Sequence, residues 1–398
     1  MAPKHLPPKQ LQNLRFFFTR SLRTSSSSSI STSAAVSPLN LAERPEPAIQ
    51  KPLTAIQDHA KPSSILDIHD HQKLFSNVPT SKLLHASSNL YLASISPMVD
   101  FGMWVMNSRL METDNILRAA MMKTVRHTFF EHFCAGEDVV EAGRCIKKVN
   151  ESGLRGMLVF AVEYTGDNDA CDQNLKGFLD TVQSAMSLPP SSVSSVVVKI
   201  TAICPLSLLE RVSDLLRWQQ RHPSFNLPWK QNKPLTPQEE HDLQLGQERL
   251  WKLSEKSVQA NIPLTVDAEN TAIQPAIDYL TYSAAIKYNK DDNPIVYGTI
   301  QAYLKDAKER LLLATKAADK MRVPMGFKVV RGAYMSRESK LASALGYDSP
   351  IHNSIQETHA CYNDCASFML EKITNRSDAV ILATHNVESG KDFKETYV

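Results

Sequence analysis

The sequence predicts an α/β fold of the barrel type, in which parallel strands alternate with helices. Its first sign is a series of short, apolar, β-rich runs separated by helix-length segments, as a parallel sheet buried on both faces requires. The second observation is that these runs end in polar residues. In a barrel of parallel strands the carboxyl ends of all strands lie at the same face, so these polar residues would lie close together there. The runs are 196–199 (Val-Val-Val-Lys), 264–267 (Leu-Thr-Val-Asp), 299–301 (Thr-Ile-Gln), 329–335 (Val-Val-Arg-Gly-Ala-Tyr-Met) and 380–386 (Val-Ile-Leu-Ala-Thr-His-Asn). This pattern is typical of an enzyme site.

Taken in order, the apolar runs give six strands, and helical patterns separate most of them. We expect strands at 156–162, 195–201, 264–269, 295–301, 326–331 and 379–383. Helices are expected at 174–186 and 206–217, from 237 onward, around 304–312 and at 352–373. The helix from 237 follows Thr236, Pro237 and Glu239, which form a capping-box signature with proline at the first helical position. A closed barrel needs eight strands, so six leave it incomplete.

The chain before the barrel divides into three predicted segments. Residues 1–42 contain no Asp or Glu but carry arginines among serines and phenylalanines, as in a transit peptide. Arginine outweighs lysine near the phenylalanines, which favours the mitochondrion over the plastid; a disordered basic tail is the competing interpretation. Residues 43–80 are proline-dotted and predict a linker, 81–150 predict a helical arm, and 151–398 predict the incomplete barrel.

Composition excludes several classes of protein. The 398 residues include 44 basic and 42 acidic side chains, a formal net charge of +2, so nucleic-acid binding is not indicated. No uncharged apolar run reaches about 18 residues, so a membrane-spanning helix is not expected. The six cysteines form no metal-type pair and suit a reducing compartment. We predict no metal site and no cysteine chemistry.

Three charged residues at strand ends are the first candidates for chemistry. Lys199 follows three valines, so its ammonium must be paired or lie at the mouth of a site; snorkelling from the strand end is the alternative. Asp267 and Glu269 alternate along one strand and share a face. They could act as acid and base, or they could anchor cations such as Lys328 and Arg331.

The remaining candidates suit a flat anionic ligand. Arg331 can grip phosphate or stabilise a reduced ring anion, while Gly332 and Ala333 let a flat ligand approach the backbone. Tyr334 alone is as consistent with packing as with substrate contact, and His385 alone is more often a structural hydrogen-bonder than a catalyst. Gln301 alone is uninformative, although an amide buried at a strand end needs a hydrogen-bond partner. No Gly-x-Gly-x-x-Gly follows a strand, which argues against a Rossmann dinucleotide site. The residues alone predict a barrel enzyme for a phosphate-bearing ligand and leave the reaction open.

The motifs also resemble those of a known family. The segment 326–334 (Gly-Phe-Lys-Val-Val-Arg-Gly-Ala-Tyr), with Ala-Thr-His-Asn at 383–386, is similar to proline dehydrogenase, as are 130–138 (Phe-Glu-His-Phe-Cys-Ala-Gly-Glu-Asp) and 196–201. The resemblance covers about residues 101–386 in the family's order, and the mitochondrial enzymes of eukaryotes fit best.

The resemblance implies a distorted (β/α)8 TIM-type barrel with FAD at its carboxyl mouth. It implies oxidation of L-proline to 1-pyrroline-5-carboxylate, with electrons passed to quinone on the matrix side of the mitochondrial inner membrane, where the protein would make peripheral contact. Lys199 would hold the substrate carboxylate, Asp267 would organise the pocket and Tyr334 would pack beside the substrate. The implied flavin contacts are Asp267, Ala268, Gln301, Lys328, Arg331, Gly332, Ala333, Thr384 and His385.

The chain departs from the family pattern after the Thr-His-Asn strand. Two further strands and a final helix, with an arginine pair for the substrate carboxylate, are expected in the family, whereas this chain ends at Val398. Alternative hypotheses are therefore a C-terminally truncated, non-catalytic form, a hydroxyproline-specific variant, and a barrel enzyme for another phosphate ligand.

Overall fold

The computed structural model describes residues 72, 75–76, 78–151, 153–220, 233–375 and 377–397. The predicted transit peptide and nearly all of the predicted linker lie outside these residues. The described chain divides into two compact units, one ending at Gly136 and the other beginning at Glu137. The sequence placed this boundary at residue 150; the structure assigns α9 (Val139–Glu151) to the second unit. Among the described residues, no helix combines the length and apolar character needed to span a membrane.

The first unit is helical, as predicted. Its elements are α5 (Thr80–Ser94), α6 (Ser96–Met106), η3 (Arg109–Met111), α7 (Ile116–Val125), the π-helical turn η4 (Arg126–Phe130) and α8 (Glu131–Phe133). Asn115 caps α7 by accepting a hydrogen bond from the Arg118 amide at 2.7 Å. The buried Asn89 donates to the Thr128 carbonyl at 3.1 Å, which ties α5 to η4.

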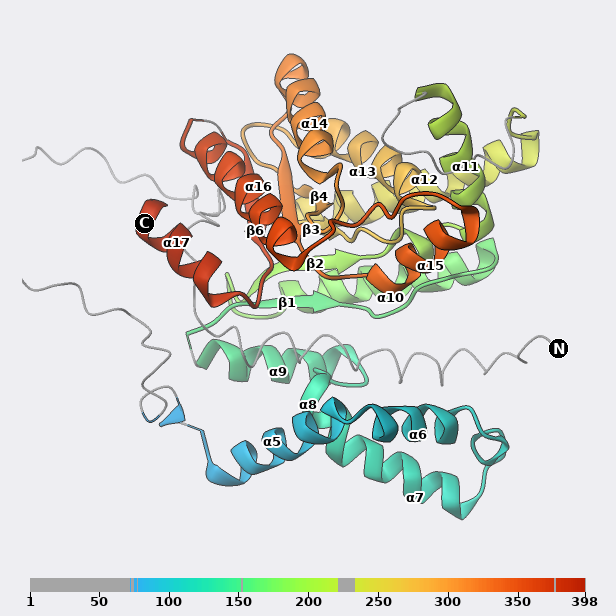
Figure 1. Cartoon of the computed structure of the whole chain (residues 1–398), viewed down its shortest axis with the longest axis vertical. Coiled ribbons are helices and arrows are strands. Elements are labelled where there is room, and N and C mark those ends of the chain that lie inside the picture. Colours follow the sequence, from blue (N-terminus) through green and yellow to red (C-terminus); the bar gives the residue numbers. More distant parts are fainter. Residues whose placement is uncertain are drawn as a thin grey trace, which may run out of the picture. The chain divides into compact units, whose positions relative to one another are not determined.

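The second unit is built on a sheet of six parallel strands curled into a half-barrel (Figure 1). The strands run in sequence order: β1 (Gly156–Val159), β2 (Val193–Val198), β3 (Leu264–Val266), β4 (Val296–Gln301), β5 (Gly326–Val330) and β6 (Ala379–Leu382). Every residue of β3 and β4 is buried, because helices cover one face and the curled sheet encloses the other. The predicted parallel α/β fold with six strands is confirmed.

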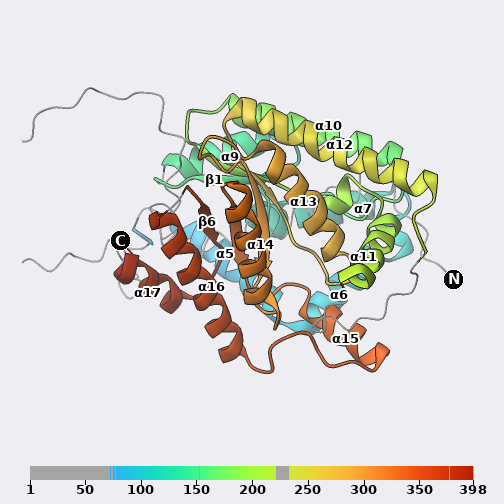
Figure 2. The same ribbon diagram turned by 90° about the horizontal axis from the view of Figure 1, so that it is seen from above.

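Helices connect each strand to the next. They are α10 (Asn168–Met186), α11 (Leu206–Gln220), α12 (Pro237–Ala260), α13 (Gln274–Tyr288), α14 (Ala307–Met321), α15 (Met335–Leu345), α16 (Ile355–Asn375) and, after β6, α17 (Val387–Tyr397). Figure 2 shows α12, α13 and α14 following one another along the sheet. The predicted capping box is confirmed, since the Thr236 hydroxyl accepts from the Glu239 amide and the Glu239 carboxylate accepts from the Thr236 amide.

The structure corrects the sequence-based element bounds in two respects. Strands end earlier than predicted: β3 stops at Val266, and β2 stops at Val198 before a short 3-10 helix, η5 (Ile200–Ala202). Helices α13, α15 and α17 were not predicted. The buried positions of α13 lie on one face, but the opposite face exposes Tyr279 and Ile286, so the sequence shows no contrast between an apolar and a polar face. Helices α15 and α17 are largely polar.

Candidate functional site

Lys199 lies where β2 gives way to η5, at the carboxyl end of the sheet. Its ammonium donates to the Tyr334 hydroxyl at 3.0 Å and pairs with the Glu163 carboxylate at 3.2 Å. Burial lowers the pKa of Lys199, but Asp267, Tyr334, Glu269 and Glu163 together raise it above the ordinary lysine value. The ammonium therefore remains charged, and it is paired rather than extended into solvent.

Asp267 stands between two ammonium groups. It follows β3 directly and forms an ion pair with Lys328, whose strand is two positions along the sheet. Burial raises the pKa of Asp267, while Lys328 and Lys199 lower it, and the net pKa is below the ordinary aspartate value. Anchoring of cations, one of the two roles considered from the sequence, is thus what the geometry shows for this carboxylate.

Glu269 occupies a different environment from Asp267 although both follow the same strand. Its side chain is fully buried, and its carboxylate accepts hydrogen bonds from the Thr201 hydroxyl at 2.9 and 3.0 Å and from the Thr201 amide at 3.3 Å. Burial raises the pKa of Glu269 to about 7, against the lowering effects of Lys199 and of the Thr201 hydrogen bonds. This carboxyl can therefore change its protonation state near neutral pH.

Gln301 lies at the end of β4 and is buried. Its amide nitrogen donates to the Glu269 carbonyl at 2.6 Å and to the Tyr303 hydroxyl at 2.8 Å. Its carbonyl oxygen is buried without a hydrogen-bond partner among the described residues. An acceptor in that position suits a ligand that carries an N–H group.

A second group of predicted residues gathers around Arg331, just after β5. The Arg331 Nε and Nη2 atoms donate to the Thr384 hydroxyl at 3.1 and 2.7 Å. Gly332 and Ala333 are exposed, and Gly332 has a φ of 85°, a conformation that favours glycine. A methyl group on Gly332 would meet no atom within 4 Å, so the backbone there is open to a ligand. Ala268 is half-buried after Asp267, and His385 is exposed after Thr384.

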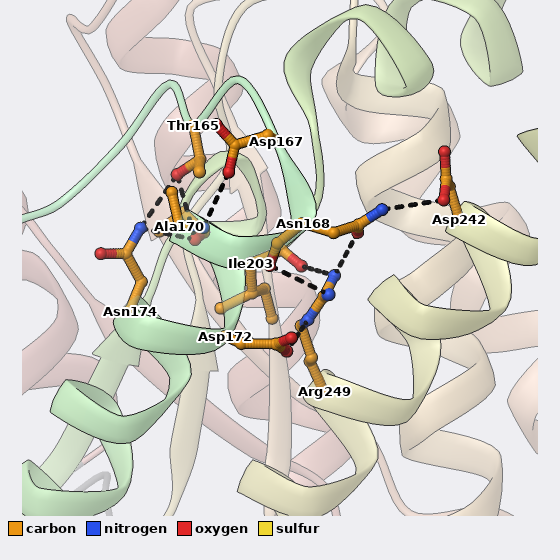
Figure 3. Close-up of polar contacts among 10 residues, drawn as sticks. Thr165, Asp167, Asn168, Ala170, Asp172, Asn174, Ile203, Asp242 and Arg249 are labelled. Atoms are coloured by element: carbon orange, nitrogen blue, oxygen red, sulfur yellow. Dashed lines mark hydrogen bonds and ion pairs between the residues drawn. The ribbon is translucent and has the colours of Figure 1, made fainter.

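The loop that carries Glu163 is held by a polar network (Figure 3). The Thr165 amide donates to the Thr201 carbonyl at 2.8 Å, and Asn174 donates to the Thr165 hydroxyl at 2.9 Å. Nearby, Arg249 is buried and binds Asp172, the backbone and side chain of Asn168, and the Ile203 carbonyl. These contacts tie the start of α10 to the carboxyl end of β2 and to α12, and so place Glu163 near Lys199.

Sequence reasoning missed several contributors to the site. Glu163 was not among the predicted candidates, although it pairs with Lys199. His359 and Tyr362 were not recognised at all, although both contact Arg331. Their positions three residues apart on one helix, together with Asn363, place polar and aromatic groups on one face, and that spacing was the available signal.

The site residues fit a flavin. Lys328 and Arg331 supply cations for phosphate or a reduced ring, Gly332 and Ala333 leave the backbone open to a flat ring, and Gln301 offers an unpartnered buried acceptor. The predicted residues fall into two groups, one around Lys199 and Asp267 and the other around Arg331.

A half-barrel of parallel strands with paired charges at its carboxyl end defines an α/β enzyme of the barrel class. The family model for proline dehydrogenase matches residues 145–396. The chain is 53% identical over 355 residues to the mitochondrial proline dehydrogenase 2 of Arabidopsis thaliana, a match that covers 84% of this chain and 74% of that protein. It is 48% identical over 386 residues to proline dehydrogenase 1 of the same plant, which covers 91% of this chain and 76% of that protein.

The fold also matches a solved structure, proline utilization A (PutA) from Bdellovibrio bacteriovorus inactivated by N-propargylglycine. The TM-score is 0.54 at 18% identity, and the match covers 69% of this chain but 27% of the PutA chain, so it concerns the fold alone. The family match and the plant relatives carry the assignment. The chain belongs to the proline dehydrogenase family of oxidoreductases.

Proposed function

We propose that this chain is an FAD-dependent proline dehydrogenase, which oxidises L-proline to 1-pyrroline-5-carboxylate in proline catabolism and passes the electrons to quinone. The observation that carries the proposal is the charged Lys199 ammonium beside Tyr334 at the carboxyl end of the sheet, in a chain 53% identical to a proline dehydrogenase. A fixed cation at this place suits a small substrate whose carboxylate must be oriented.

The proposed substrate contacts come from the group around Lys199. An ammonium has three N–H donors, and two of them point at Tyr334 and Glu163, which leaves the third for the proline carboxylate. Asp267 balances the charges of Lys199 and Lys328 and so holds both near the substrate. Burial raises the pKa of Tyr334, so its phenol stays protonated and packs beside the substrate as a neutral group.

The proposed flavin contacts are the residues that follow β3, β4, β5 and β6. They are Asp267, Ala268, Gln301, Lys328, Arg331, Gly332, Ala333, Thr384 and His385. When bound, the flavin would take up the hydride that proline loses. The chain's own part is to hold proline and the ring together, to present cations to the ring and its phosphates, and to keep the substrate carboxylate oriented.

The proposal extends to location. Two relatives from Arabidopsis thaliana are mitochondrial, and residues 1–42 have transit-peptide composition. We therefore place the protein on the matrix side of the mitochondrial inner membrane, in peripheral contact with the quinone-bearing bilayer. Import of the full chain into isolated mitochondria, compared with a chain that begins near Glu43, tests this assignment; equal import of both would contradict it.

The central test is the visible absorption spectrum of the purified chain before and after anaerobic addition of L-proline. We expect flavin bands that bleach on addition, because proline would reduce the bound flavin. A colourless, folded protein, or flavin bands that proline leaves unchanged, would contradict the proposal. A parallel addition of hydroxyproline serves as the control for substrate identity, and faster bleaching by hydroxyproline would assign the chain to that substrate instead.

A further inference from the structure

Helix α16 presents polar and aromatic groups to Arg331. His359, Tyr362 and Asn363 lie three and four residues apart, so they share one face of the helix. The His359 Nδ1 atom lies 2.7 Å from Arg331 Nη1, and the guanidinium carbon lies 3.8 Å from the centre of the Tyr362 ring. The Asn363 side chain accepts a hydrogen bond at 2.7 Å from Ser389, whose hydroxyl in turn accepts from Arg331 Nη2 at 2.9 Å.

The contacts leave little freedom to the guanidinium. Arginine carries five N–H donors, and the hydrogen bonds to Thr384, Ser389 and His359 use four of them. The second hydrogen atom on Nη1 has no hydrogen-bond acceptor among the described residues. The Tyr362 ring is fully buried, and it supports one flat face of the guanidinium through a cation–π contact. Arg331 is therefore a cation of fixed orientation with a single donor left for a ligand.

The contact with His359 has a defined hydrogen-bond direction. A guanidinium can only donate, so Nδ1 of His359 is the acceptor in this pair, and the other ring nitrogen, Nε2, lies 3.5 Å from the Asn386 amide nitrogen. His359 is thus placed to orient Arg331 through one acceptor atom.

We infer that His359 and Tyr362 are positioning residues, which hold the Arg331 guanidinium in the orientation that binds the flavin. This inference rests on the proposed function, since it assigns Arg331 to the cofactor. Neither residue touches the proposed substrate group around Lys199 in any contact described above. Their effect on cofactor affinity should pass entirely through Arg331.

The test is the affinity of the full chain for FAD, measured by quenching of flavin fluorescence on titration with flavin-free protein. His359→Phe keeps a ring but removes the acceptor, and we expect about tenfold weaker binding, as for loss of a hydrogen bond to a charged group. His359→Asn keeps an acceptor near the place of Nδ1, and we expect it to restore affinity to within about threefold of wild type. Tyr362→Leu removes the ring that contacts Arg331, whereas Tyr362→Phe keeps it, so we expect only the first substitution to weaken FAD binding.

A double-variant comparison decides whether the effect passes through Arg331. In an Arg331→Gln background, His359→Phe should weaken FAD binding by less than about twofold, because the group that it positions is already gone. An equal loss in both backgrounds, or wild-type affinity in His359→Phe, would overturn the inference while leaving the proposed function intact. A wild-type chain that binds no FAD would overturn both. Thermal unfolding of each variant, followed by circular dichroism, shows that the weaker binders are folded.

Discussion

Arg249 gives the sharpest test of how the site is supported. Its side chain is 3% exposed, and it donates to the Asn168 side chain at 2.9 Å, the Ile203 carbonyl at 3.2 Å and the Asn168 carbonyl at 3.3 Å. It also pairs with Asp172 at 2.7 Å (Figure 3). We consider Arg249→Met, which keeps much of the side-chain volume but removes every donor.

The expected cost follows from these contacts. Each of the three hydrogen bonds to Asn168 and Ile203 contributes about 1 kcal/mol. The Asp172 side chain is 66% exposed, so its ion pair adds only about 0–1 kcal/mol. Removing a buried charge recovers part of its desolvation cost. We therefore expect the free energy of unfolding to fall by about 2–3 kcal/mol.

The assay is urea unfolding followed by far-ultraviolet circular dichroism, with the change read from the midpoint at constant slope. The matched control is Asp172→Asn, which removes only the exposed partner and should cost less than about 1 kcal/mol. A loss of less than about 0.5 kcal/mol in Arg249→Met, or an equal loss in the control, would refute the reasoning.

Three further predictions concern the site and the sheet. Lys199→Met should lower kcat/KM for proline by about 30–100-fold while leaving FAD affinity unchanged, because it removes a charged donor to substrate; a matching loss of FAD affinity would contradict the assignment. Folding raises the pKa of Glu269 from 4.5 to about 7, so the folded state holds the proton of this carboxyl more tightly than the unfolded state does. The contribution of this carboxyl to stability is therefore complete below pH 4.5 and is lost as the pH rises through 7. The difference in unfolding free energy between wild type and Glu269→Gln should thus shift by about 3 kcal/mol against wild type from pH 4 to 8, and a constant difference in urea unfolding would show that folding does not raise the pKa of this carboxyl. Gly326→Ala would set a methyl group 2.5 Å from the buried Tyr297 ring and should cost about 1–3 kcal/mol in the same assay. Gly298→Ala, whose new contacts would be 3.5 Å, is its control, and equal costs would show that the ring moves aside freely.

The strands and their polar ends could be predicted because they are local properties. Continuous apolar runs of this length favour strands that are buried on both faces. The valines before Lys199 lie in β2, and the apolar run before Arg331 lies in β5. The capping box at Thr236 is equally local, since its hydrogen bonds join residues three apart. Helix α13 could not be predicted in the same way, because its exposed face carries the apolar residues Tyr279 and Ile286 and so lacks the polar stripe that marks an amphipathic helix.

The sequence by itself determined the fold class, the order of the strands and the candidates Lys199, Asp267, Lys328, Arg331 and Tyr334, because each depends on residue type and spacing. Only the tertiary structure decided how these groups are paired. Lys199, after β2, contacts Tyr334, which follows β5 and is 135 residues away in the chain. Arg331 contacts Thr384, which is 53 residues away and follows the neighbouring strand β6. Burial then separated two carboxylates that look alike in the sequence, since Asp267 lies between ammonium groups and stays ionised, whereas the enclosed Glu269 has its pKa raised to about 7. Charge state depends on long-range packing, which residue spacing does not encode.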